Sequence, residues 1–151
     1  DQKGLDRIAD HVGQGRSFDT WAHAARDMAE SGREIFPDFT LKDWIEFAKK
    51  VYRMNSSGRI KLDYDMKIAE PFDSKGGGSG AMWNALENMK DIPTLILRGE
   101  LSDLFSERVA AQMLEKLDKG ELVTIPRVGH APTLEEPGSL DAIHQLLHRI
   151  D

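Results

Sequence analysis

Two short apolar runs constrain the fold of this chain most strongly. Residues 94–98 read Thr-Leu-Ile-Leu-Arg, and residues 121–126 read Glu-Leu-Val-Thr-Ile-Pro. Compact apolar runs of this length, bounded by Pro or Gly, are typical of strands buried on both faces of a sheet. An amphipathic stretch lies between them, capped by Ser106 and ended by Gly120. The order strand, helix, strand predicts an α/β fold in which a crossover helix joins two parallel strands in a right-handed sense.

Helical periodicity dominates the part of the chain that precedes these strands. Residues 2–12 and much of 17–53 carry apolar side chains at helical spacing. Thr20 fits an N-cap, and Thr40 with Asp43 resembles a capping box. We therefore expect a helix after each threonine, with Trp and Phe side chains on the buried side of the second.

The connecting segments divide the chain into three parts. Residues 55–58, Asn-Ser-Ser-Gly, indicate a turn, and the alternation in residues 59–65 fits a short strand or an extended arm. Residues 72–80, Phe-Asp-Ser-Lys-Gly-Gly-Gly-Ser-Gly, have the composition of a flexible loop. We expect a helical region over residues 1–71, this loop, and an α/β portion over residues 81–151.

Two more helices flank the predicted strands. The first covers residues 81–89, and its expected inward side chains are Met82, Trp83, Leu86 and Met89. The second begins at Pro137, a favourable first helical residue, and places four apolar side chains on one side: Leu140, Ile143, Leu147 and Ile150.

Composition excludes several classes of partner and chemistry. The 151 residues are enough for one ordinary domain, and 40% of them are apolar. The net charge is −6 and no run of Lys and Arg stands out, so nucleic acid and anionic membranes are poor partners. No apolar run approaches the ~20 residues that span a bilayer, and no signal peptide is visible. There is no cysteine, which rules out disulfides and thiolate catalysis and fits a reducing, cytoplasmic location.

Two chemically active side chains follow the two predicted strands. Asp103 comes shortly after the first strand, and His130 comes shortly after the second. Parallel strands ~4.8 Å apart bring both loops to one edge of the sheet, where open α/β sheets bind ligands. A carboxylate there can orient an imidazole and stabilise its protonated form. The plainer alternative is that His130 is a loop residue and Asp103 a turn or capping residue.

At these residues the chain resembles the α/β-hydrolase family. Ile-Pro-Thr-Leu-Ile-Leu-Arg-Gly-Glu-Leu-Ser-Asp (92–103) and Leu-Val-Thr-Ile-Pro-Arg-Val-Gly-His (122–130) are similar to the last two strands of that fold and their loops. Residues 17–53 are similar to the lid inserted before them. The resemblance implies that His130 is the general base, Asp103 is the triad acid, the substrate is a small ester or amide, and no metal or organic cofactor is needed. Glu100 is the alternative acid, although it lies close to the strand.

The nucleophile of such a triad is missing from the sequence. The family's Gly-x-Ser-x-Gly elbow is absent, and residues 77–80, Gly-Gly-Ser-Gly, have the wrong spacing. The family's order is nucleophile, acid, histidine, so the nucleophile belongs upstream, and the chain resembles the C-terminal half of the fold. We expect a missing N-terminal half or a second copy of the chain as partner. The alternative is a non-catalytic fragment that associates through its exposed sheet edge.

The remaining polar residues carry weaker signals. Ser102 and Ser106 are hydroxyls near the acid, and capping explains both. His144 and His148 have the i, i+4 spacing of metal ligands, but a solvated helix flank is the favoured interpretation. The aromatic residues of 18–52 are expected to pack the lid, with a substrate pocket as the alternative role.

Overall fold

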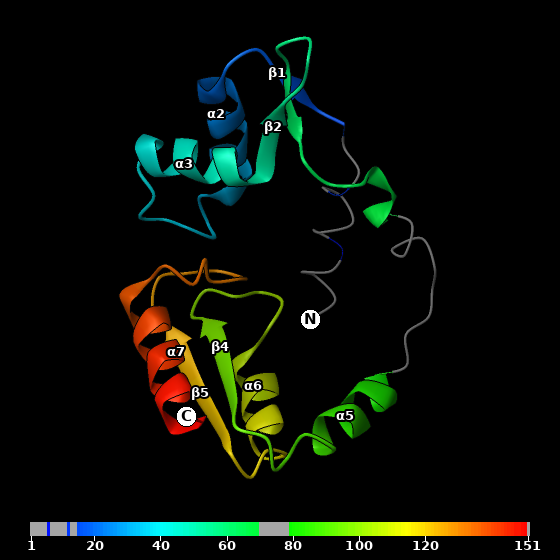
Figure 1. Cartoon of the computed structure of the whole chain (residues 1–151), viewed down its shortest axis with the longest axis vertical. Coiled ribbons are helices and arrows are strands. Elements are labelled where there is room, and N and C mark those ends of the chain that lie inside the picture. The colour runs from blue at the N-terminus through cyan, green and yellow to red at the C-terminus, as the bar shows by residue number, and fades with distance from the viewer. Residues whose placement is uncertain (1–5, 7–11, 13–14, 70–78, 151) are drawn as a thin grey trace. The chain divides into compact units, whose positions relative to one another are not determined.

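The computed structural model describes Asp6, Val12 and residues 15–69 and 79–150. The chain divides into two compact units, Leu5–Lys75 and a second made mainly of Gly76–Asp151. Figure 1 traces both of them. The helix expected over residues 2–12 and most of the loop expected over residues 72–80 lie outside the described residues. Within the described parts, no helix is long and apolar enough to cross a bilayer.

Two capped helices form the centre of the first unit. Helix α2 covers Trp21–Gly32 and helix α3 covers Leu41–Val51. The Thr20 side chain accepts a hydrogen bond from the His23 backbone N–H, and Thr40 and Asp43 form the predicted capping box. Both caps satisfy backbone donors that have no partner within the helix.

Aromatic side chains provide the core between these helices and the loop that joins them. Phe36 and Phe39 stack with ring centroids 4.6 Å apart, and Trp44 meets Phe39 edge to face at 5.0 Å. Phe47 lies within 6.2 Å of the other three rings. These rings therefore pack mainly on one another, as expected for side chains that fill a core.

A small antiparallel sheet completes the first unit and was only partly predicted. Strands β1 (Ser17–Phe18), β2 (Tyr52–Met54) and β3 (Ile60–Leu62) pair in the order β1-β3-β2. The predicted turn joins β2 to β3, and Gly58 adopts a φ of 76°, which suits glycine. A 3₁₀ helix, η1, follows at Met66–Ala69. The sequence indicated only the third strand, because the alternation around it extends over residues 59–65, whereas β1 and β2 have too few residues to show one.

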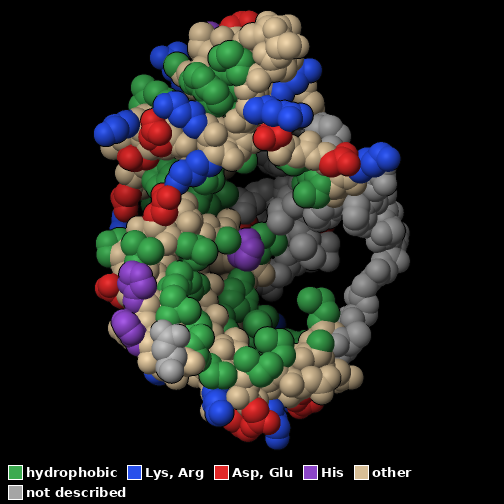
Figure 2. Space-filling model, viewed as in Figure 1, with side chains coloured by type: hydrophobic (Ala, Val, Ile, Leu, Met, Phe, Trp, Pro, Cys, Tyr) green, Lys and Arg blue, Asp and Glu red, His purple; other side chains and the backbone are tan. Residues whose placement is uncertain are grey.

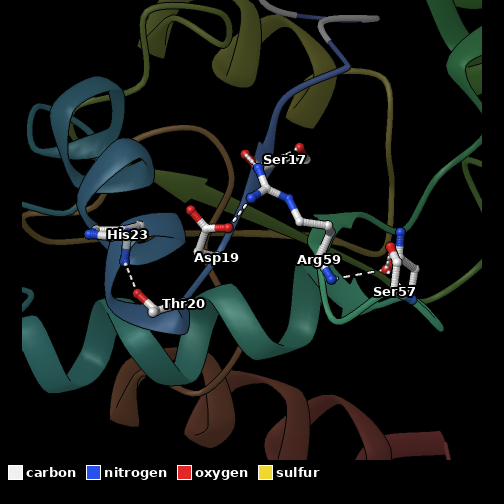
Figure 3. Close-up of polar contacts among 7 residues, drawn as sticks. Ser17, Asp19, Thr20, His23, Ser57 and Arg59 are labelled. Carbon is white, nitrogen blue, oxygen red and sulfur yellow. Dashed lines mark hydrogen bonds and ion pairs between the residues drawn. The ribbon is translucent and has the colours of Figure 1, made fainter.

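One side chain ties the edge strand β1 to the rest of this sheet. Arg59 donates from Nη2 to the carbonyl oxygen of Ser17, at 3.0 Å, and to the Ser17 hydroxyl, at 3.1 Å. Figure 3 shows its guanidinium reaching Asp19 as well, close to the Thr20 cap. The start of α2 is thus fastened to the sheet by the residues just before it.

The second unit contains the parallel strand pair that the sequence predicts. Helix α5 (Ser79–Glu87) precedes β4 (Thr94–Gly99), helix α6 (Glu107–Leu114), β5 (Gly120–Ile125) and helix α7 (Pro137–Ile150). The strands run parallel, with Thr94 opposite Gly120 and Gly99 opposite Ile125. Helices α6 and α7 lie on either side of this pair (Figure 1). Ser106 caps α6 and Pro137 begins α7, as expected; α5 begins at Ser79, two residues before the expected start.

The buried sides of α5 and α7 differ from the prediction. In α7 the buried residues are Ser139 and Ala142, whereas Leu140, Leu147 and Ile150 are 42%, 47% and 53% exposed. In α5, Met82 is 78% exposed. Figure 2 shows hydrophobic side chains on the surface of this unit near α7. A sheet of two strands is too narrow to cover all the apolar residues of α7. Part of the predicted apolar stripe therefore stays exposed to solvent.

Candidate active site

The carboxyl ends of β4 and β5 hold two loops against each other. The Glu100 N–H donates to the carbonyl oxygen of Ile125 at 2.8 Å, and the Leu101 N–H donates to that of Val128 at 2.8 Å. Backbone pairing therefore continues past both strand ends. The loop that carries Asp103 and the loop that carries His130 leave the sheet at the same edge, as their placement after parallel strands predicts.

Gly99 allows the two loops to touch. A Cβ atom at this position would lie 2.0 Å from the carbonyl oxygen of Gly129 and 2.5 Å from that of Val128. Both distances are far below van der Waals contact, so only glycine lets the backbones approach this closely. Because His130 directly follows Gly129, this contact fixes where the backbone of His130 lies relative to the end of β4.

His130 contacts the acid loop, the segment after β4 that carries Asp103, through Ser102. The Nδ1 atom of His130 lies 3.4 Å from Oγ of Ser102, the residue immediately before Asp103. Oγ of Ser102 also accepts a hydrogen bond from the Phe105 N–H, at 3.0 Å. Asp103 is half-buried in the same loop, while His130 is exposed. Sequence reasoning treated Ser102 as a cap, because nothing local indicates which distant side chain its hydroxyl faces.

Glu100, the alternative acid, bonds to backbone. Its Oε2 accepts a hydrogen bond from the Arg127 N–H at 2.7 Å. Arg127 has a φ of 57°, which costs a non-glycine residue roughly 1–2 kcal/mol, and this hydrogen bond offsets part of that cost. Glu100 thus fastens the start of the histidine loop, the segment after β5 that carries His130, to the end of β4. Sequence reasoning did not identify this structural role.

A buried arginine shapes the acid loop from below. Arg98 is 5% exposed, and it donates from Nε to the carbonyl oxygen of Phe105 at 2.7 Å and from Nη2 to that of Glu100 at 3.2 Å. The charged Glu107 carboxylate lies 3.9 Å from Nη1, which makes no hydrogen bond among the described residues. One side chain therefore grips both ends of the segment that holds Ser102 and Asp103. An arginine inside an apolar strand was the sequence signal for this role.

A carboxylate closes the other end of the histidine loop. Glu136 accepts hydrogen bonds from the Thr133 N–H at 2.8 Å, the Thr133 hydroxyl at 2.9 Å and the Ser139 hydroxyl at 2.7 Å. Burial opposes its ionisation, but the bonds from Ser139 and Thr133 outweigh burial and hold the pKa of this carboxyl below its ordinary value. Glu136 immediately precedes α7 and lies outside its first turn.

The described residues contain no group of three or more side chains that could hold a metal ion. His144 and His148 are both exposed on α7. The arrangement at the sheet edge thus consists of an imidazole, a neighbouring hydroxyl and a carboxylate-bearing loop. A hydroxyl and a carboxylate of this kind can orient an imidazole for proton transfer.

Known proteins match the chain over much of this architecture. No model of a protein family matches it. A 3-hydroxybutyrate-oligomer hydrolase from Cupriavidus necator is 33% identical over 84 residues, which are 52% of this chain and 28% of that protein. The crystal structure of an α/β hydrolase from Novosphingobium aromaticivorans is 48% identical, with a TM-score of 0.89, over 97% of this chain and 52% of that one.

More distant structures share the fold alone. A hydrolase from Rickettsia typhi, described as putative, is 21% identical with a TM-score of 0.76, over 99% of this chain and 50% of that one. An E-2-(acetamidomethylene)succinate hydrolase is 20% identical with a TM-score of 0.73, over 98% and 53%. The chain spans about half the length of these solved structures. The chain therefore has an α/β fold that matches the C-terminal half of these α/β-hydrolase structures.

Proposed function

We propose that this chain supplies the histidine and the acid of an ester hydrolase, with His130 as general base and Asp103 as its carboxylate partner. The observation that carries the proposal is the approach of His130 Nδ1 to the loop of Ser102 and Asp103, at the carboxyl ends of two parallel strands. Ligands of open α/β sheets bind at this edge. The similarity to hydrolases over nearly the whole chain supports the same assignment.

In the proposed reaction His130 moves protons through Nε2, on the side of the ring away from Ser102. A hydroxyl nucleophile gives its proton to Nε2 as it attacks the ester carbonyl, and the imidazolium then protonates the departing alcohol. Water repeats the sequence to release the acid. Asp103 stabilises the imidazolium and directs the proton on Nδ1.

The nucleophile is proposed to come from the N-terminal half of the fold. The printed sequence contains no Gly-x-Ser-x-Gly. Ser79, the serine of the similar glycine-rich stretch, opens helix α5. Because the chain spans about half of the structures it matches, the remaining half is the natural source of a nucleophile and of oxyanion donors.

An ester is the favoured substrate class. The C. necator relative is named for hydrolysing oligomers of 3-hydroxybutyrate, and this name favours an ester over an amide here. The unit Leu5–Lys75, with its aromatic core, is proposed as the lid of the enzyme.

A second role is association, and the open side of α7 favours it. Leu140, Leu147 and Ile150 are exposed, and in the described residues β4 and β5 form a sheet of only two strands. An apolar helix side and a sheet edge of this kind call for a cover. The proposed cover is the N-terminal half of the same fold; a second copy of the chain is the alternative.

The test of catalysis uses the whole protein, including the half that carries the nucleophile, and a p-nitrophenyl ester as substrate. His130→Ala and Asp103→Asn should each lower kcat by at least about a thousandfold. His144→Ala, a change at an exposed histidine of α7, is the matched control and should leave kcat unchanged. Full activity of the His130 variant would refute the proposal.

A further inference from the structure

Ser102 lies where a hydroxyl can control the imidazole of His130. Its backbone N–H donates to the Gly99 carbonyl oxygen at 3.1 Å, and its Oγ accepts the Phe105 N–H at 3.0 Å. Arg98 binds the Phe105 carbonyl oxygen in turn. The hydroxyl oxygen is therefore held in place by both the strand end and the loop.

The histidine side of this contact is equally constrained. The carbonyl oxygen of Val128 accepts the Leu101 N–H, and Gly129 lies against Gly99. With both backbones fastened, Ser102 Oγ and His130 Nδ1 are held 3.4 Å apart, at the long end of hydrogen-bond distance.

A hydroxyl can donate a hydrogen bond to a ring nitrogen or accept one from it, so two proton arrangements fit this contact. A serine oxygen has two acceptor lone pairs, and the Phe105 N–H occupies one. The second lone pair is available to an N–H on Nδ1. Accepting that proton keeps Nε2 free of a proton, which is the form of the ring that can act as a base.

We propose that Ser102 is a positioning residue that, beside Asp103, holds the proton of His130 on Nδ1. The inference rests on the proposed function for its effect on catalysis, but the contact itself can be measured without catalysis. Ser102 acts through the imidazole and touches neither nucleophile nor substrate in this role.

The chain offers a matched control in Ser106. Its hydroxyl also accepts the backbone N–H three residues on, that of Val109, at 3.4 Å, and it caps α6. Ser102→Ala and Ser106→Ala each remove one such bond in the same loop, and only the first removes the contact with His130. A purely structural role for Ser102 predicts similar consequences for both variants.

The first measurement is the tautomer of His130, read from the ¹⁵N shifts of its ring by NMR. Ser102→Ala should lower the share of neutral rings protonated at Nδ1, Ser106→Ala should leave it unchanged, and Ser102→Thr should preserve it. If the share of neutral His130 rings protonated at Nδ1 is unchanged in the Ser102→Ala variant, the inference is overturned, whatever activity the protein has.

The second measurement is ester hydrolysis by the whole protein. Ser102→Ala should lower kcat about tenfold without raising KM, because the change affects the base and not substrate binding. Ser102→Thr should restore most of kcat. Equal losses in the Ser102→Ala and Ser106→Ala variants would reduce Ser102 to a structural residue. If the whole protein shows no ester hydrolysis even with His130 in place, the proposed function is refuted instead.

Discussion

Gly99 and Gly129 are in direct contact, with no room for a Cβ atom on Gly99 because it would lie 2.0 Å from the carbonyl oxygen of Gly129. One glycine ends β4 and the other immediately precedes His130. Their contact joins the acid loop and the histidine loop at the level of the backbone, so the candidate site depends on two residues that have no side chain to contribute.

Replacing Gly99 by alanine should therefore damage both stability and site. The added methyl group must push the histidine loop away, and we expect a loss of at least about 2 kcal/mol in the free energy of unfolding. Chemical denaturation measures it. Gly138→Ala is the control, because a Cβ there would meet only Ile125 Cδ1 at 3.6 Å and alanine favours a helix. Equal stability of the two variants would contradict the contact.

Arg98 should be needed for the shape of the acid loop. Arg98→Met keeps a long apolar stem but leaves the carbonyl oxygens of Phe105 and Glu100 without its donors. We expect a loss of roughly 1–3 kcal/mol in the free energy of unfolding, together with faster hydrogen exchange of the Phe105 N–H.

The control for this prediction is Glu107→Gln. The Glu107 side chain is 84% exposed and 3.9 Å from Arg98, so its charge should matter little. A Glu107 variant as unstable as Arg98→Met would show that the ion pair, and not the bonds to the carbonyl oxygens, sustains the loop.

Glu136 should stabilise the histidine loop in a pH-dependent manner. Its pKa is lowered in the folded protein relative to its ordinary value of 4.5, so its contribution is present above that pH and is lost as the pH falls through the folded pKa. The difference in unfolding free energy between the parent and Glu136→Gln should be largest near pH 7 and shrink below about pH 4.5. A constant difference from pH 7 to pH 3 would contradict this role.

Tyr52 should titrate unusually late. Burial, with a smaller contribution from the charge of Asp27, raises the pKa of its phenol to about 12. A phenol whose folded pKa exceeds its unfolded value of 10 favours the folded state below pH 10, and the advantage is lost as the pH rises toward 12.

An absorbance titration near 295 nm checks this assignment, since the chain has only two tyrosines. Tyr52→Phe should abolish the late transition, whereas Tyr64→Phe should leave it in place. Loss of the late transition in the Tyr64 variant would show that the transition belongs to Tyr64, and the assignment to Tyr52 would be wrong.

Much of the second unit followed from local signals. The parallel pair β4–β5 was predicted from two apolar runs separated by one amphipathic stretch, and Ser106 and Pro137 marked helix starts correctly. Glycine and proline act on their own backbone and caps act within one turn, so such features can be predicted from neighbouring residues alone.

The three-stranded sheet of the first unit was harder to predict. Only β3 had a visible alternation, and β1 and β2 become strands because β3 lies between them. The orientation of α7 has a similar origin. Its sequence offers more apolar surface than two strands can cover, and packing places Ser139 and Ala142 inward.

The sequence by itself determined the strand–helix–strand order, the helix caps and the placement of Asp103 and His130 after neighbouring strands, because each depends on residues close together in the chain. Tertiary structure alone decided that Ser102 faces His130, that Glu100 binds the Arg127 N–H, and that Arg98 grips the acid loop. Those contacts depend on sub-ångström placement of backbones, such as the approach at Gly99, and no local pattern of residue types encodes such distances.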